Sequence, residues 1–252
     1  MDASYTLNRT IGIIGGMGPL ATSELFRKII LLNNVSKDWH HPRVLIDSNT
    51  QIPSRVRHFL YSEPSPLPKL IETVNSLHAS GAEVLLMPCV TAHYFHNELV
   101  RKTGRNIVNL IDELIGVIWI DRPTVKTIGV LGTEYTCVDT YQGQPTNSVL
   151  IEALRSADIE VISPNPAQLI VVRQLIENVK RGRVTQETQS KFDGIISDLL
   201  SSGADSIVLA CSELTLLNND LRGKERVYDS VEILAKAGLK YAARFEGNHF
   251  ES

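Results

Sequence analysis

The chain has 252 residues, of which 43% are hydrophobic and 21% charged, so it carries enough apolar material for one large or two small globular cores. Its formal net charge of -3 indicates neither a nucleic acid nor a membrane surface as a partner. No apolar run approaches the ~20 residues that cross a bilayer, and the polar segment Met1–Thr10 lacks the apolar centre of a signal peptide, so we expect a cytoplasmic protein.

Short apolar runs alternate with longer amphipathic segments along the whole chain. The runs typical of buried strands are Ile11–Ile14, Val44–Ile46, Val84–Met87, Ile128–Leu131, Ile159–Ile162 and Ile207–Leu209. The segments with helical spacing are Leu20–Leu32, Pro68–Ser80, Ala92–Lys102, Ile107–Ile118, Thr140–Ser156, Leu169–Arg181, Thr185–Ser202 and Val231–Arg244, and the proline-rich stretch Ser62–Pro68 predicts a loop. This alternation predicts an α/β fold with mainly parallel sheets flanked by helices.

The sequence also repeats itself. The segment Arg9–Gly15 (RTIGIIG) is echoed by Lys126–Gly132 (KTIGVLG). Further on, Ser80-Gly81-Ala82-Glu83 leads into a strand that ends at Cys89, and Ser202-Gly203-Ala204-Asp205 leads into one that ends at Cys211. Two matches in the same order and at nearly the same spacing indicate a duplicated α/β unit. Ligands bind outside the carboxyl ends of strands in open α/β sheets, and both cysteines occupy such ends.

Three cysteines cannot all pair with one another, and none of them forms a C-x-x-C motif. The sequence therefore predicts free thiols and no metal site. A free cysteine is most often a small buried hydrophobic residue, and we interpret Cys137, which has no counterpart in the other repeat, as structural.

Cys89 and Cys211 occupy equivalent positions, each between a buried strand and an expected helix start. The positive end of a helix dipole favours the thiolate, so each cysteine is a candidate acid or base. Two such groups on opposite faces of one carbon are what racemisation needs. The carbanion would be stabilised by backbone N–H groups of the glycine turns and by the hydroxyls of Thr91, Thr133 and Ser212.

Four stretches resemble the aspartate/glutamate racemase family, and within it the aspartate racemase branch. They are Gly12–Pro19, Asn49–Arg55, Met87–His93 and Ala210–Leu214, with weaker support from Leu131–Thr136 and Val179–Lys180. The resemblance implies a homodimeric enzyme that uses no pyridoxal phosphate or other cofactor. It also implies two pseudo-symmetric Rossmann-like lobes with the active site in the cleft between them. We divide the chain into 1–115 plus 224–252, which holds Cys89, and 116–223, which holds Cys211.

The resemblance further implies roles for individual residues. Cys89 and Cys211 would be the two acid/base groups, and Arg55 and Lys180 would bind the side-chain carboxylate of a small acidic amino acid. The remaining substrate contacts would come from Met17, Gly18, Asn49, Gln51, Val90, Thr91, Thr133, Ser212 and Glu213. The sequence departs from the family at Val90, where an asparagine is usual, and at Ser212, which replaces a threonine but keeps the hydroxyl. His93 is expected to be a buried or capping residue.

Three other interpretations of the sequence remain open. The segment Gly16–Ala21 fits a relaxed G-x-G-x-x-A pattern, and Asp47 could bind a ribose, as in a nicotinamide-dependent dehydrogenase. A decarboxylase or cis–trans isomerase of the same superfamily is a second alternative, and a non-enzymatic amino-acid-binding protein is a third. The sequence leaves the choice between aspartate and glutamate open.

Overall fold

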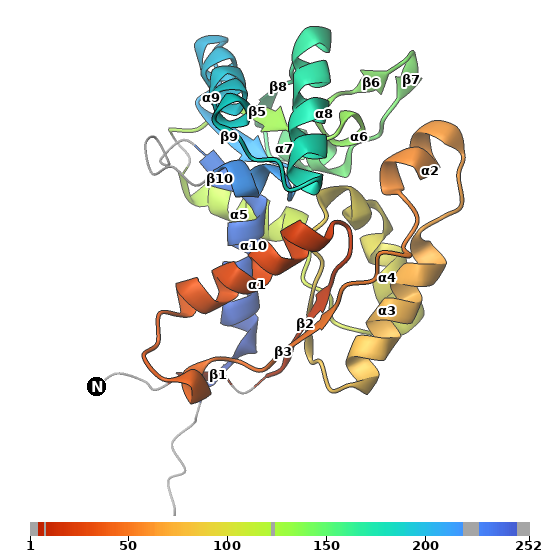
Figure 1. Ribbon diagram of the computed structural model, residues 1–252, viewed down its shortest axis with the longest axis vertical. Coiled ribbons are helices and arrows are strands. Elements are labelled where there is room, and N and C mark those ends of the chain that lie inside the picture. The colour runs from red at the N-terminus through yellow and green to blue at the C-terminus, as the bar shows by residue number, and fades with distance from the viewer. Residues whose placement is uncertain (1–4, 8, 122–123, 219–226, 246–252) are drawn as a thin grey trace, which may run out of the picture.

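The computed structural model describes residues 5–7, 9–121, 124–218 and 227–245, and it forms two parallel sheets flanked by helices (Figure 1). The first sheet has the order β3-β2-β4, and the second has the order β10-β9-β5-β8. Their strands are β2 (Ile11–Ile14), β3 (Val44–Asp47), β4 (Val84–Leu86), β5 (Thr127–Leu131), β8 (Glu160–Ile162), β9 (Ser206–Leu209) and β10 (Val227–Asp229). The predicted α/β class and its six predicted strands are confirmed.

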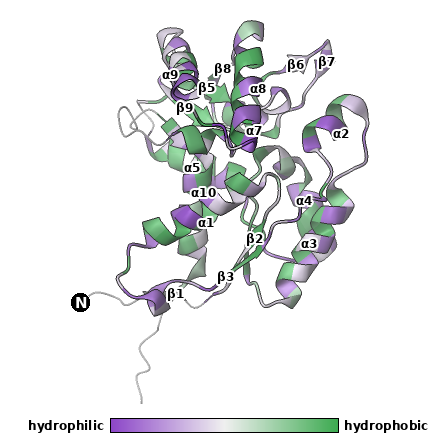
Figure 2. Ribbon diagram, in the orientation of Figure 1, coloured by the Kyte–Doolittle hydropathy of each residue, from purple (hydrophilic) through white to green (hydrophobic). Residues whose placement is uncertain are grey.

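Most of the predicted helices form close to their expected bounds. They are α1 (Pro19–Asn33), α3 (Leu67–Ala79), α8 (Pro166–Lys180), α9 (Gln186–Ser201) and α10 (Ser230–Ala242). Their starts are encoded locally: a proline occupies the first turn of α1, and Asn165 and Gln168 form a capping box at α8. Figure 2 shows hydrophobic residues along β2 and a mixed surface along α3, as expected for a buried strand beneath an amphipathic helix.

Three helix predictions are corrected by the structure. The segment Ala92–Lys102 is a 3₁₀ turn, η2 (Val90–Phe95), followed by α4 (His96–Thr103). The helix expected from Ile107 starts later, as α5 (Leu110–Asp121), because Ile107 forms a parallel bridge with Leu85. The first half of Thr140–Ser156 is a hairpin, β6 (Thr140–Tyr141) and β7 (Gln144–Pro145). Gln142 and Gly143 turn it with positive φ, and Ser148 caps the shorter α7 (Val149–Ser156).

Several elements were not foreseen from periodicity. They are α2 (Arg55–Tyr61), α6 (Glu134–Cys137), the 3₁₀ turns η1 (Asp38–His40) and η3 (Leu214–Leu217), and an antiparallel pair of β1 (Tyr5–Leu7) with β11 (Ala243–Phe245). The predicted helix Val231–Arg244 therefore ends at Ala242. None of the helices in the described part of the chain combines the length and the apolar character that a bilayer crossing requires.

The two halves repeat one another in three dimensions. The strands β2 and β5 lie centrally in their sheets, and their glycines approach neighbouring elements closely: a Cβ at Gly12 would lie 2.7 Å from Ala82 Cβ, and one at Gly129 would lie 2.6 Å from Ile207 Cδ1. The bridge from Leu85 to Ile107 occupies the place that the β9–β10 pair occupies in the second sheet. The duplication inferred from the sequence therefore corresponds to a structural repeat.

The last helix of each half packs against the other half. Helix α10 follows β10 of the second sheet and runs beside α1 of the first lobe (Figure 1). It also contacts β4, whereas α5 packs on α7 and on α10. One hydrophobic core consequently runs through both lobes and includes Ile13, Leu114, Val130 and Leu234. The division at residue 115 stays a prediction, and the boundary between 223 and 224 lies outside the described residues. Val227–Asp229, assigned to the first lobe from the sequence, pairs with the second sheet.

Candidate active site

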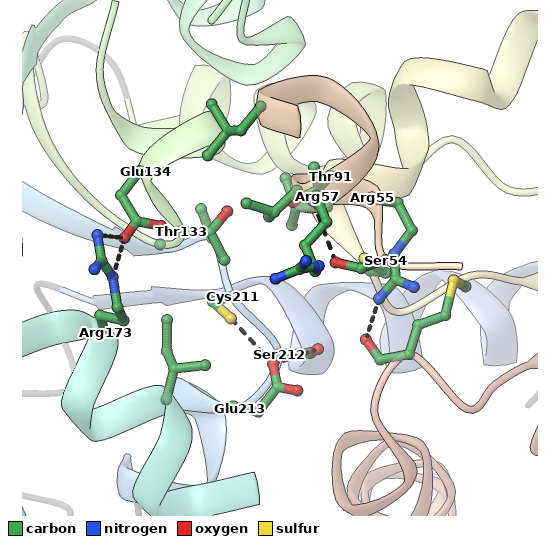
Figure 3. A pocket seen from close by; sticks show the side chains of 18 of the residues that line it. Ser54, Arg55, Arg57, Thr91, Thr133, Glu134, Arg173, Cys211, Ser212 and Glu213 are labelled. Atoms are coloured by element: carbon green, nitrogen blue, oxygen red, sulfur yellow. Dashed lines mark hydrogen bonds and ion pairs between the residues drawn. The ribbon is translucent and has the colours of Figure 1, made fainter. Parts of the chain in front are cut away.

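A cavity of about 330 Å³ opens between the carboxyl ends of the two sheets, and both Cys89 and Cys211 line it. Cys89 lies beyond the end of β4, and Cys211 lies beyond the end of β9. Figure 3 shows Cys211, Thr133 and Glu134 on one side of this pocket and Ser54, Arg55 and Thr91 on the other. The cavity takes its lining from both halves of the duplicated chain: Met17, Ser54–Arg57, Leu60, Tyr61, Cys89–Thr91, Gly132–Glu134, Tyr141, Arg173, Ile176, Glu177, Lys180 and Ala210–Glu213.

The Cys211 thiol faces a carboxylate. Its Sγ atom donates a hydrogen bond to Glu213 Oε2 at 3.0 Å, and both side chains are buried (Figure 3). Burial raises the pKa of the Cys211 thiol well above its usual value, the Glu213 carboxylate raises it further, and the Lys180 cation opposes the change. The expected shift toward the thiolate is therefore wrong for Cys211, because desolvation and the neighbouring carboxylate both favour the protonated thiol.

The backbone of Cys89 is held by a buried histidine. His93 Nδ1 lies 3.0 Å from the Cys89 carbonyl oxygen, and the Leu110 amide donates to His93 Nε2 at 3.1 Å. Burial lowers the pKa of His93 to about 4, so the ring is neutral at pH 7 and donates through Nδ1. His93 thus links the Cys89 loop to the first turn of α5, as expected for a structural histidine.

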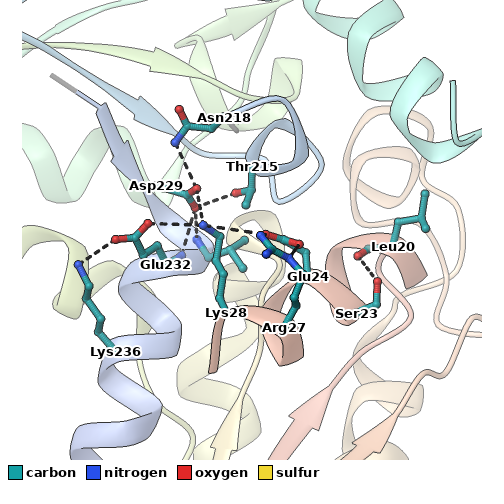
Figure 4. Close-up of polar contacts among 11 residues, drawn as sticks. Leu20, Ser23, Glu24, Arg27, Lys28, Thr215, Asn218, Asp229, Glu232 and Lys236 are labelled. Atoms are coloured by element: carbon teal, nitrogen blue, oxygen red, sulfur yellow. Dashed lines mark hydrogen bonds and ion pairs between the residues drawn. The ribbon is translucent and has the colours of Figure 1, made fainter. Parts of the chain in front are cut away.

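The loop after Cys211 is attached to α10 in the equivalent place. Thr215 Oγ1 donates to Asp229 Oδ1 at 2.7 Å, and Asp229 caps α10 through the amides of Val231 and Glu232 (Figure 4). Lys28 Nζ of α1 lies 3.4 Å from Asp229 Oδ2, and this mostly buried ion pair links the cluster to the first lobe. Each cysteine loop is therefore anchored to the helix that follows its own repeat.

A chain of hydroxyl groups joins the two lobes beside the pocket. Thr91 Oγ1 lies 2.8 Å from Thr136 Oγ1, which lies 2.9 Å from Thr133 Oγ1. Thr91 and Thr133 were predicted from the sequence, whereas the buried Thr136 between them was not. Ser212 also lines the cavity, so the hydroxyls predicted at the site are brought together there.

Arg55 differs from the other cations of the pocket. Its guanidinium donates to the carbonyl oxygens of Pro53 at 3.0 Å and Met17 at 3.3 Å, and its buried Nε has no hydrogen-bond partner among the described residues. The other cations all form ion pairs: Arg57 with Glu63, Arg173 with Glu134, and Lys180 with Glu213 at 3.9 Å. Within the described chain, Arg55 is thus the pocket cation that lacks a carboxylate partner.

Three of the predicted substrate contacts do not line the cavity. Asn49 donates to Thr73 Oγ1 at 2.9 Å and accepts from the Gln51 amide at 3.0 Å, so both residues stabilise their own loop. Gly18 lies close to Glu213, and a Cβ at Gly18 would be 3.0 Å from Glu213 Oε1. The remaining predicted contacts are in the lining: Met17, Arg55, Val90, Thr91, Thr133, Lys180, Ser212 and Glu213.

The glycine turn after β2 uses its amides internally. The Gly15 amide donates to the Asp47 carbonyl oxygen, and the Gly16 amide donates to Thr22 Oγ1, both at 2.9 Å. Gly16 also has φ of +85° and packs against the backbone of Asn49. A dinucleotide phosphate binds at the N-terminus of the helix that follows such a turn, and Pro19 at the start of α1 has no N–H to offer it, so this turn disfavours the dehydrogenase interpretation.

Several lining residues were not found from the sequence. Among them are Arg173, Ile176 and Glu177, which share one face of α8 with Lys180. Residues three and four positions apart share one face of a helix, so the assignment of Lys180 to the site was a signal that these three residues also face it. Cys137, in contrast, is buried away from the pocket, and burial raises the pKa of its thiol to about 12, consistent with a structural role.

The fold and this pocket define the class of two-lobed α/β racemases. The sequence model of the family described as Asp/Glu/Hydantoin racemase matches residues 14–238, and the chain belongs to this family. It is 28% identical over 231 residues to the broad specificity amino-acid racemase RacX of Bacillus subtilis, covering 90% of this chain and 95% of that protein.

Solved structures agree with this assignment. The chain resembles the aspartate racemase of Picrophilus torridus with a TM-score of 0.78 and 25% identity, over 94% of this chain and 96% of that one. An aspartate racemase homologue from Pyrococcus horikoshii shares the fold, with a TM-score of 0.71 and 24% identity over 93% of this chain and 99% of that one.

Proposed function

We propose that this protein is a cofactor-independent racemase that interconverts L- and D-aspartate by proton transfer between Cys89 and Cys211. The observation that supports this most directly is that one cavity takes one cysteine from each half of the duplicated fold. A substrate carbon held between two such groups can lose a proton on one face and gain one on the other. The similarity to aspartate racemases and to a broad specificity racemase supports the same reaction class.

The proposed reaction balances with these groups alone. The thiolate of one cysteine takes the α-proton, so that the substrate C–H bond breaks and an S–H bond forms. The thiol of the other cysteine then donates its proton to the opposite face of the carbanion, and the product is the enantiomer. The hydroxyls of Thr91, Thr133 and Ser212 line the cavity and are proposed to stabilise charge on the substrate carboxylate.

Arg55 is the proposed ligand of the substrate's side-chain carboxylate. Its lack of a carboxylate partner among the described residues leaves a partly buried cation available to an acidic substrate. Lys180 is half exposed and already pairs with Glu213, so we propose that it contributes less than Arg55 to binding the side-chain carboxylate. Val90 is buried and cannot hydrogen-bond through its side chain, so its backbone N–H is the group left at that position to contact the substrate.

The test is to incubate the protein with L-aspartate in deuterated water without added cofactor, and to follow deuterium at the α-carbon together with chirality. Racemisation with one deuterium per inversion is expected. Release of carbon dioxide would instead indicate a decarboxylase, and binding without exchange would indicate a binding protein. Glutamate and alanine in parallel reactions measure breadth of specificity, and sedimentation analysis tests the proposed homodimer.

A further inference from the structure

The two cysteine loops differ at one chemically important position. In the repeat, Cys89-Val90-Thr91 corresponds to Cys211-Ser212-Glu213. Thr91 directs its hydroxyl to Thr136 at 2.8 Å, whereas the Glu213 carboxylate accepts the Cys211 thiol at 3.0 Å. Equivalent positions therefore carry a neutral hydroxyl beside one cysteine and a carboxylate beside the other, which makes a pseudo-symmetric site chemically unequal.

Glu213 is nearly sealed from solvent, with 4% of its side chain exposed. Its Oε2 atom accepts from Cys211 and lies 3.5 Å from Ser212 Oγ, and its Oε1 atom makes no hydrogen bond within the described chain. The Lys180 ammonium, at 3.9 Å from Oε1, is too distant for a hydrogen bond. A buried carboxylate needs donors, and the Cys211 S–H is one that it has.

Resting on the proposed function, we infer that Glu213 is a positioning residue that holds the proton on Cys211 in the free enzyme. The resting site then presents Cys211 as the acid, and Cys89 is left to act as the base. Once Cys211 has given its proton to the substrate, its thiolate lies beside the Glu213 carboxylate. Repulsion between the two anions favours return of a proton from solvent to Cys211, while Cys89 releases the one it took.

Other charged or titratable side chains around the cavity come from several elements. They are Arg55, Arg57 and Tyr61 of α2, Glu134 of α6, Tyr141 of β6, and Arg173, Glu177 and Lys180 of α8, together with Cys89. Of these, Lys180 is the one that lowers the pKa of Cys211. Arg57 and Arg173 are paired with their own carboxylate partners, and the charged groups that shift the pKa of Cys211 are Glu213 and Lys180.

This asymmetry has a kinetic signature. Enantiomers are equally stable, so kcat/KM must be the same in both directions whatever the protonation state of the site. The enantiomer that requires a deprotonated Cys211 finds only a minor fraction of the free enzyme competent to bind it. Its KM and kcat should both be raised by the same factor relative to the other enantiomer, and Glu213→Gln should bring the two KM values closer together.

The direct experiment measures the pH dependence of Cys211 alkylation by iodoacetamide, read by peptide mass spectrometry. In Glu213→Gln the alkylation midpoint should fall by about one pH unit or more, which raises the thiolate fraction about tenfold below both midpoints. At pH values below both midpoints, the rate of Cys211 alkylation should rise only about threefold, because a thiolate of lower pKa is less nucleophilic. Glu177→Gln is the matched control, because Glu177 lines the same cavity but pairs with Arg181. The midpoint of Cys211 alkylation in this variant should equal that of the wild type.

Two further variants keep the inference open to refutation if Glu213→Gln does not fold. Glu213→Asp retains the carboxylate and should keep a high midpoint, whereas Lys180→Gln removes a half-exposed cation and should raise the midpoint. A Glu213→Gln midpoint that is unchanged or higher overturns the inference, as does a Lys180→Gln midpoint that is unchanged or lower. A protein with the expected midpoints but no α-proton exchange on any amino acid would refute the proposed function while leaving the Cys211–Glu213 pair in place.

Discussion

Replacing Arg55 by alanine should impair catalysis on aspartate far more than on alanine. Arg55 is the pocket cation without a carboxylate partner among the described residues, and two of its donors already bind backbone carbonyls. Arg55 lines the cavity, and we expect its guanidinium to bind the side-chain carboxylate of aspartate; a hydrogen bond between charged groups contributes about 1.5–3 kcal/mol. We expect Arg55→Ala to lower kcat/KM for aspartate by a factor of about 10 to 150, since 1.4 kcal/mol corresponds to tenfold.

The assay is α-proton exchange in deuterated water, followed by NMR with aspartate and alanine side by side. Loss of the two contacts to Pro53 and Met17 should affect both substrates, so the ratio of the two kcat/KM values isolates the carboxylate interaction. Arg173→Ala provides a control, because Arg173 is already paired with Glu134. The kcat/KM of Arg55→Lys for aspartate should lie between those of Arg55→Ala and the wild type, since lysine keeps the charge but cannot bind a carboxylate through two N–H groups. Equal losses for aspartate and alanine would refute the assigned role.

Further perturbations test the site and the fold. Cys89→Ala and Cys211→Ala should each lower racemisation by at least about 100-fold with unchanged circular dichroism, and wild-type interconversion by either variant would end the two-base proposal. Burial lowers the pKa of His93 to about 4, below the unfolded value of about 6.5, so the stability present above pH 6.5 is lost as the pH falls toward 4. In urea unfolding, the free energy of unfolding of His93→Gln should fall by about 3 kcal/mol less than that of the wild type over this pH range. The same pH dependence in both proteins would contradict this. Gly12→Ala should destabilise the protein toward the upper end of about 1–3 kcal/mol, because the new Cβ meets the fixed Cβ of Ala82. Gly129→Ala should destabilise it less, because its new Cβ meets the flexible end of the Ile207 side chain. The reverse order in chemical unfolding would argue against this packing.

Much of the secondary structure follows from local pattern. The strands around Ile13 and Val130 are short and apolar, and the helix starts at Asn165 and Pro19 carry their own capping signals. The failures also have local causes. The hairpin at Thr140–Pro145 depends on two residues with positive φ, and helical apolar spacing does not reveal such a turn.

The site could be predicted in part. The equivalence of Cys89 and Cys211 is visible in the repeat, and the structure brings both to one cavity. Asn49 was not separable from a substrate ligand, because its short polar side chain serves loop hydrogen bonds equally well. The contribution of Arg173 depends on the packing of α8 over the cleft, which no local motif records.

The alternation of strands and helices, the duplication and the cysteine at each equivalent strand end can all be read from the amino-acid order. Those features depend on residues close together in the chain or on direct similarity between its halves. Three features emerge only from packing: α5 and α10 cross between the lobes, Arg55 has no carboxylate partner in the described chain, and burial together with Glu213 raises the pKa of Cys211. Such outcomes depend on burial and on which charges meet in space, and both arise only when distant segments pack together.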